Sequence, residues 1–105
     1  MSLTVNKEIF QTTVILKIIG ILDISTINGI LPFLELENEV EKLIFDFSDL
    51  EFIDSTGIGI IIEAIYQSQE VNFTIELKGL DEETREIFET VGVFKILEAI
   101  QREVY

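Results

Sequence analysis

The part of the chain that most constrains its fold is residues 42–59, KLIFDFSDLEFIDSTGIG, whose character changes twice. Residues 43–47 are aliphatic and aromatic apart from Asp46, which is typical of a strand that is covered on both faces. A short acidic turn follows, and residues 58–62 then form an apolar run with helical character. The sequence therefore predicts a buried strand, a turn and a helix in direct succession.

Three consecutive residues before the predicted helix, Asp54, Ser55 and Thr56, are all suited to an N-cap. Two hydroxyls therefore fall where the unpaired amides of a helix N-terminus point. That position suits a phosphate, either bound or covalently attached. Hydroxyls are also ordinary caps, so on spacing alone the simpler interpretation is that Ser55 or Thr56 caps the helix.

The composition excludes several classes of function. A chain of 105 residues predicts one domain, residues 1–105, with a core that needs no disulfide or metal. Cysteine and histidine are both absent, which excludes the usual zinc sites and every catalytic triad that needs an imidazole. No metal or cofactor is expected. There is no apolar run of the roughly 18 residues that a membrane span needs and no signal-peptide pattern, so a cytoplasmic protein is expected.

The charge is strongly unbalanced, with 20 acidic and 7 basic residues and a net charge of −13. Direct binding to nucleic acid or to an anionic membrane needs the opposite sign, because neutralised phosphates drive such binding. The acidity fits a partner with a basic face, or solubility alone.

The N-terminal third predicts two strands. Residues 3–10 alternate weakly and predict an edge strand, and residues 12–19 alternate strongly and predict an inner strand that ends at Gly20. The turn that follows places Asp23 at the carboxyl end of that strand.

Residues 24–41 have helical spacing with a defect. Asn28-Gly29 interrupts the pattern, and Pro32 removes one helical hydrogen bond. We expect a kinked helix, or a helix that begins near Leu31 with the proline in its first turn. The acidic residues between 35 and 41 are expected on a solvated surface.

The second half of the chain continues the alternation of strands and helices. The apolar residues of 58–68 cover more than one face, so this helix is either deeply buried or presents its first turn to a partner. Residues 71–78 alternate cleanly and predict a half-exposed strand. The segments predicted to be adjacent strands, with the helix 58–68 packed on them, are residues 14–19, 43–47 and 71–77.

A further helix is predicted to begin after the cap Asp81 and to end at Gly92, where a left-handed residue is needed. The buried side of this helix is predicted to be Ile87, Phe88 and Val91. Residues 93–97 are expected to form a short apolar return, and residues 98–105 a brief terminal helix.

Strands that alternate with helices at this spacing predict an α/β fold with parallel strands and right-handed crossovers. In such sheets the functional crevice lies at the carboxyl ends of the strands. Asp23 and the turn 54–56 are both expected there.

Three motifs together resemble a known family. They are Gly20-Ile21-Leu22-Asp23, the segment from Leu43 through Phe52-Ile53-Asp54-Ser55-Thr56-Gly57-Ile58-Gly59, and Val91-Gly92-Val93-Phe94-Lys95-Ile96. The chain resembles the STAS domain and, more narrowly, a stand-alone bacterial anti-sigma factor antagonist. The resemblance covers about residues 14–97.

The resemblance implies a mixed, mainly parallel sheet of four to five strands, with helices in a right-handed βα superhelix. It also implies phosphorylation on Thr56 by a partner that is both anti-sigma factor and serine/threonine kinase, and a phosphatase that resets the switch. The unphosphorylated form binds the partner; a homodimer is compatible with the family. The residues that it implies for partner binding are Asp23, Asp54, Ser55, Thr56, Gly57 and Ile58.

The acceptor position departs from the commonest pattern, because sigma-factor antagonists more often carry serine there. Threonine is closer to the stress-sensing assemblies of the same family. The alternative is therefore a STAS interaction module of a stress-sensing or transport-associated complex that is not switched by phosphorylation. An enzyme is not expected, because Gly57-Ile58-Gly59 is too short for a phosphate-binding loop of the Walker type.

Overall fold

The structure, a computed structural model, describes residues 2–104. The strands are β1 (Leu3–Phe10), β2 (Thr13–Leu22), β3 (Lys42–Asp46), β4 (Leu50–Ile53) and β5 (Thr74–Lys78). The helices are the 3₁₀ turns η1 (Ile27–Gly29) and η2 (Leu31–Leu34), and the α-helices α1 (Ser55–Val71), α2 (Glu82–Val91) and α3 (Val93–Val104).

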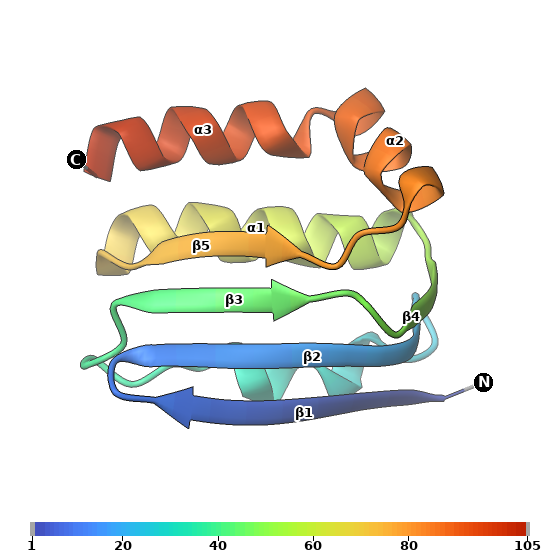
Figure 1. The fold of residues 1–105 in the computed structure, drawn as a ribbon, viewed down its shortest axis with the longest axis horizontal. Helices are drawn as coiled ribbons and strands as arrows, with labels where there is room; N and C mark the ends of the chain where they lie inside the picture. Colours follow the sequence, from blue (N-terminus) through green and yellow to red (C-terminus); the bar gives the residue numbers. More distant parts are fainter. Residues whose placement is uncertain (1, 105) are drawn as a thin grey trace.

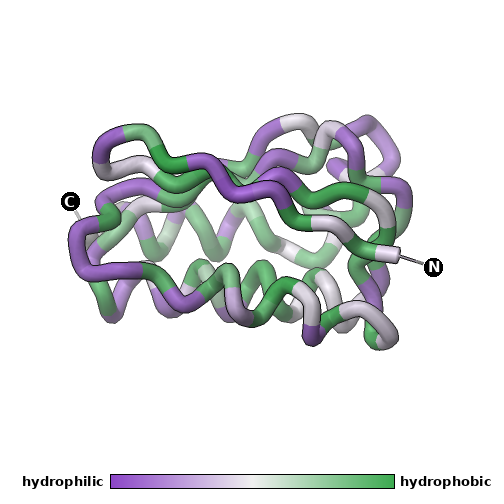
Figure 2. Tube along the Cα trace, turned by 90° about the horizontal axis from the view of Figure 1, so that it is seen from below, coloured by the Kyte–Doolittle hydropathy of each residue, from purple (hydrophilic) through white to green (hydrophobic). Residues whose placement is uncertain are grey.

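The strands form one five-stranded sheet in the order β1-β2-β3-β5, with β4 beside the end of β2 (Figure 1). β1 pairs with β2 antiparallel, and the other pairings are parallel. Figure 2 shows the strands in one layer and the helices in a second layer on one side of it. The predicted α/β fold with a mixed, mainly parallel sheet is therefore confirmed.

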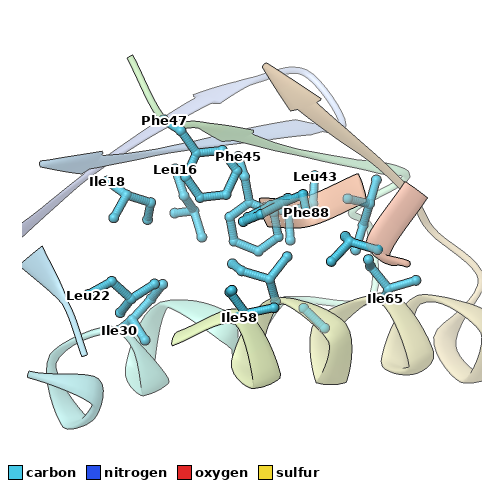
Figure 3. Packing of buried hydrophobic residues seen from close by; sticks show 14 of the residues in the cluster. Leu16, Ile18, Leu22, Ile30, Leu43, Phe45, Phe47, Ile58, Ile65 and Phe88 are labelled. Carbon is cyan, nitrogen blue, oxygen red and sulfur yellow. The ribbon is translucent and has the colours of Figure 1, made fainter. Parts of the chain in front are cut away.

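The core lies between these two layers, because the strands alternate and the helices cover one face only. β2 contributes Leu16 and Ile18, β3 contributes Phe45, and α1 contributes Ile58 and Ile65 (Figure 3). All five side chains are at least 94% buried. The predicted adjacency of the three inner strands is confirmed by the pairing of β2 with β3 and of β3 with β5.

β2 does not end at Gly20, as predicted, but continues to Leu22. Gly20 has φ +94°, and the register with β4 shifts there, because Leu50 pairs with Gly20 and Phe52 pairs with Ile21. A bulge of this kind uses the positive φ that glycine tolerates. The sequence correctly predicted an irregularity at Gly20, but this irregularity is a bulge within β2 and not the end of the strand.

The kinked helix expected in residues 24–41 does not form; η1 and η2 take its place. The alternative, a helix that begins near Leu31 with the proline in its first turn, is confirmed in its start, but η2 is a 3₁₀ turn of only four residues. Pro32 lies in the first turn of η2, where its missing N–H costs nothing. Ile30, between the two turns, is fully buried and fixes the segment to the core. Short 3₁₀ turns suit such a connection because each needs only one or two hydrogen bonds.

The boundary between α1 and β5 differs from the prediction. α1 runs to Val71, which is 47% exposed, and Asn72 ends it in the left-handed conformation with φ +59°. β5 therefore begins at Thr74 rather than at residue 71. The alternation of apolar and polar residues that predicted the strand begins at Val71, which is in fact the last residue of α1.

α2 begins and ends as predicted, since Asp81 accepts a hydrogen bond from the Thr84 amide at 2.8 Å and Gly92 has φ +92°. Its buried side is narrower than predicted: Phe88 is fully buried, whereas Ile87 and Val91 are exposed. The predicted apolar return does not exist, because α3 is continuous from residue 93 to 104. Residue 105, included in the predicted terminal helix, lies outside the described residues.

The two long edges of the sheet differ. On the β5 side, the Ile75 amide donates to Oε1 of Gln101 on α3 at 2.7 Å, so a side chain satisfies one outward amide of that strand. On the β1 side, none of the described strands pairs with the outer edge.

Candidate functional site

The candidate site lies where β2 and β4 end side by side. Ile21 pairs with Phe52 and Leu22 with Ile53, so Asp23 and Asp54 leave the sheet at the same edge. The Asp54 amide donates to the Leu22 carbonyl at 3.3 Å, which continues the pairing by one residue. The expectation that both aspartates lie at the carboxyl ends of the strands is confirmed.

Asp54 is the N-cap of α1. Its Oδ1 accepts a hydrogen bond from the Gly57 amide at 2.9 Å, and its Oδ2 accepts one from the Ile24 amide at 3.1 Å. The interpretation of Ser55 or Thr56 as the cap is therefore wrong. An aspartate at this position also places negative charge at the positive end of the helix.

Asp23 organises the turn after β2. Its Oδ1 accepts hydrogen bonds from the Ser25 hydroxyl at 2.6 Å and from the Ser25 amide at 2.9 Å, and its own amide donates to Oγ1 of Thr26 at 3.0 Å. The hydrogen bond from the Ser25 hydroxyl is the main cause that holds the pKa of Asp23 below its usual value, against the opposing effect of burial. Asp23 is 8% exposed, so it shapes the turn from inside.

Ser55 and Thr56 are the first two residues of α1. Ser55 is exposed and Thr56 is half-buried. Among residues 2–104, neither hydroxyl has a hydrogen-bond partner. Because Asp54 supplies the cap, both hydroxyls are available for other chemistry.

Gly57 and Ile58 lie inside the protein. A Cβ on Gly57 would be 2.5 Å from the Leu22 carbonyl oxygen and 2.7 Å from Cγ1 of Ile53, so only glycine lets α1 pack this closely on the strand ends. Ile58 is 5% exposed and belongs to the core. Gly57 and Ile58 therefore pack the start of α1 against the strand ends, next to the exposed Ser55 and the half-buried Thr56.

Two exposed apolar side chains that the sequence analysis did not single out flank the site. Ile24, directly after Asp23, is 73% exposed, and Phe52, within β4, is 55% exposed. Phe52 was missed because β4 itself was interpreted as a turn. The only sequence signal for their exposure was that each apolar residue follows an acidic one, Asp23 before Ile24 and Glu51 before Phe52.

The ion pairs within the protein lie away from this site. The two ion pairs among the described residues, Lys17 with Asp49 at 3.0 Å and Lys42 with Glu76 at 3.1 Å, involve none of its residues. Lys17 and Lys42 alternate with core residues of β2 and β3, so they lie on the sheet face opposite the helices. Among the side chains that the structure describes, in residues 2–101, no cluster of three or more acidic side chains could hold a metal ion. None of the described helices is long and apolar enough to cross a membrane.

A sequence model described as the STAS domain matches residues 4–105. An anti-sigma factor antagonist from Mycobacterium paratuberculosis has a similar structure, with TM-score 0.75 and 20% identity over 98% of this chain and 94% of that one. The phosphorylated form of the Bacillus cell fate determinant SpoIIAA gives TM-score 0.70 and 22% identity over 96% and 98%. Mglu gives TM-score 0.66 and 18% identity over 73% of this chain, which spans 20% of the Mglu chain. At these identities the structural likenesses show a shared fold.

Proposed function

This chain belongs to the STAS domain family, and on that premise we propose that it is an anti-sigma factor antagonist switched by phosphorylation of Thr56. The observation that carries the proposal is the free hydroxyl of Thr56 in the first turn of α1, beside a cap that Asp54 already supplies. The partner is an anti-sigma factor with serine/threonine kinase activity in the cytoplasm, and a phosphatase resets the switch. The protein acts by binding and is not itself an enzyme.

The modification is a simple phosphoryl transfer. Oγ1 of Thr56 bonds to the γ-phosphorus of ATP held by the kinase, ADP leaves, and a base of the kinase takes the hydroxyl proton. The product carries about 1.5 to 2 negative charges at neutral pH. Ser55 is exposed and Thr56 is only half-buried, so this part of α1 can be reached by another protein.

The fold tolerates this charge for two reasons. Thr56 is only half-buried and neither caps the helix nor packs in the core. A negative group in the first turn of a helix is also stabilised by the helix dipole, by roughly 0.3–2 kcal/mol.

A complex at the same surface does not tolerate it. Binding would remove water from the phosphate, and Asp54, which lies two residues away, already places a carboxylate there. Desolvating a charge without a matching cation costs several kcal/mol. Phosphorylation should therefore release the partner while the protein stays folded.

The exposed side chains around Thr56 define the contact that we propose. Ser55 and Thr56 supply its polar centre, and Ile24 and Phe52 supply apolar area that is exposed in the free protein. Asp23 and Asp54 hold the two turns in position, and Gly57 and Ile58 fix the helix beneath them. Large apolar side chains of this kind commonly carry much of the energy of an interface.

The test is phosphorylation by the cognate kinase in vitro, read by intact mass, for the wild type and the variants Thr56→Ala and Ser55→Ala. We expect one phosphate on the wild type and on Ser55→Ala, and none on Thr56→Ala. Phosphate on Thr56→Ala but not on Ser55→Ala would contradict the assignment. Partner binding with no phosphate on any variant would favour the alternative, an unswitched STAS interaction module.

A further inference from the structure

A groove of about 600 Å³ lies between η2 and α1, outside the site described above. Its apolar lining comes from Leu31 and Leu34 of η2 and from Ile60 and Ala64 of α1. Leu31 is 41% exposed, so part of this apolar surface is open to solvent. Both elements lie in the helix layer beneath the sheet (Figure 3).

The charged residues that line the groove are all negative. Glu35, Glu63 and Glu70 line it, and no lysine or arginine does. None of these glutamates takes part in either ion pair of the described residues. Apolar side chains next to carboxylates are complementary to a surface that carries apolar and basic side chains side by side.

The shape of the groove follows α1. Ile60, Glu63, Gln67 and Glu70 are spaced i, i+3, i+7 and i+10, so they form one stripe along the helix. Ten residues of α-helix span about 15 Å, close to three turns. A helix of similar length can lie along the groove with apolar residues at i, i+3 and i+7 toward the floor.

We propose that this groove is a docking site for a basic amphipathic helix of a protein partner. The leucines or similar side chains of that helix pack on Leu31, Leu34 and Ile60, and its lysines or arginines pair with the rim glutamates. A segment of this kind is attracted by the net charge of −13 as well as by the local rim.

The groove adds to the phosphorylation site without depending on it. Thr56 precedes Ile60 by one helical turn and does not line the groove. A partner that contacts the start of α1 could therefore occupy the groove at the same time. Two linked contacts on one helix would increase the affinity through their effective concentration.

The test uses a fluorescein-labelled 14-residue peptide with leucine at i, i+3, i+4 and i+7 positions and lysine elsewhere, titrated with the full chain. Glu63→Gln/Glu70→Gln is expected to weaken binding about five- to tenfold, since each exposed pair contributes up to about a factor of five. The matched control Glu82→Gln/Glu83→Gln, which removes the same charge from α2, should change binding less than about twofold. Leu31→Ser should weaken binding as well, and far-UV circular dichroism verifies the fold of each variant.

Three results would overturn the proposal. They are equal losses in the two double variants, equal binding of a scrambled peptide with the same composition, and self-association that Leu31→Ser abolishes, which would assign the groove to a second copy of the chain. Thr56→Ala should bind the peptide like the wild type. Failure of the peptide assay would leave the phosphorylation experiment unaffected, so the two proposals are tested separately.

Discussion

Oδ2 of Asp54 accepts a hydrogen bond from the Ile24 amide at 3.1 Å, across 30 residues of sequence. The same carboxylate caps α1 through Oδ1, so one side chain joins the turn after β2 to the start of the helix. The turn that carries Asp23 and the helix turn that carries Thr56 are therefore held as one unit. A partner that bound at this site would meet both segments in a fixed arrangement, which lowers the entropic cost of binding.

Asp54→Ala should lower the free energy of unfolding by about 1–2 kcal/mol, because both the cap and the link to Ile24 are lost. Asp54→Asn should lower the free energy of unfolding less, since asparagine caps nearly as well. Its NH₂ group cannot accept a hydrogen bond from the Ile24 amide, so only the link to Ile24 would be lost. Urea denaturation of both variants measures the difference. Wild-type stability of Asp54→Asn would show that the link to Ile24 contributes nothing, whereas equal losses in the two variants would show that the cap contributes nothing.

Thr56→Ala should change the free energy of unfolding by less than about 0.5 kcal/mol, because Thr56 neither caps α1 nor fills the core. Thr56→Glu should fold equally well and bind the partner more weakly, through the charge that it adds to the contact. Thermal melts and partner pull-down measure the two effects. Thr56→Ser is the control, which should keep both binding and phosphorylation.

The two motif glycines should respond in opposite directions to alanine. Gly57→Ala should destabilise the protein by about 1–3 kcal/mol, since its Cβ would meet the Leu22 carbonyl oxygen at 2.5 Å. Gly59→Ala should stabilise it by up to about 1 kcal/mol, because a Cβ there has no neighbour within 4 Å and alanine favours the helix. Chemical denaturation tests both. Destabilisation by Gly59→Ala would contradict the packing described for α1.

Asp23 should contribute to the acid stability of the turn. Its pKa is lower in the folded protein than in the unfolded chain, so its contribution is complete above the unfolded value and is lost as the pH falls through the folded value. Ser25→Ala removes the main cause and should raise the pKa of Asp23 toward the usual value of an aspartate. Carboxyl ¹³C NMR of Asp23 during a pH titration measures it. Ser55→Ala, which removes a hydroxyl that Asp23 does not bind, should leave that pKa unchanged.

The inner strands and the position of the site could be predicted from the sequence because they rest on strong local patterns. Apolar runs define β2 and β3, and in a parallel sheet the ends of neighbouring strands must meet, which brings Asp23 to Asp54. The caps Asp81 and Gly92 were predictable for the same reason: each depends on its own residue type.

The remaining features depend on tertiary contacts that leave little local signal. β4 has four residues, one of them the exposed Phe52, and is a strand only because β2 offers it a partner. Asp54, rather than one of the two hydroxyls, caps α1, and its carboxylate also accepts a hydrogen bond from the Ile24 amide, a contact distant in sequence that leaves no local signal. Ile87 faces solvent because Phe88 alone fills the space between α2 and the core.

The hydrogen bond from the Ile75 amide to Gln101 bears on where this sheet can grow. Continuous growth of a β-sheet from molecule to molecule needs two free edges on each molecule, and Gln101 of α3 occupies one outward amide of the β5 edge. A strand that added to β5 would first have to displace this side chain. The β1 edge, with which none of the described strands pairs, presents no such obstacle to an added strand.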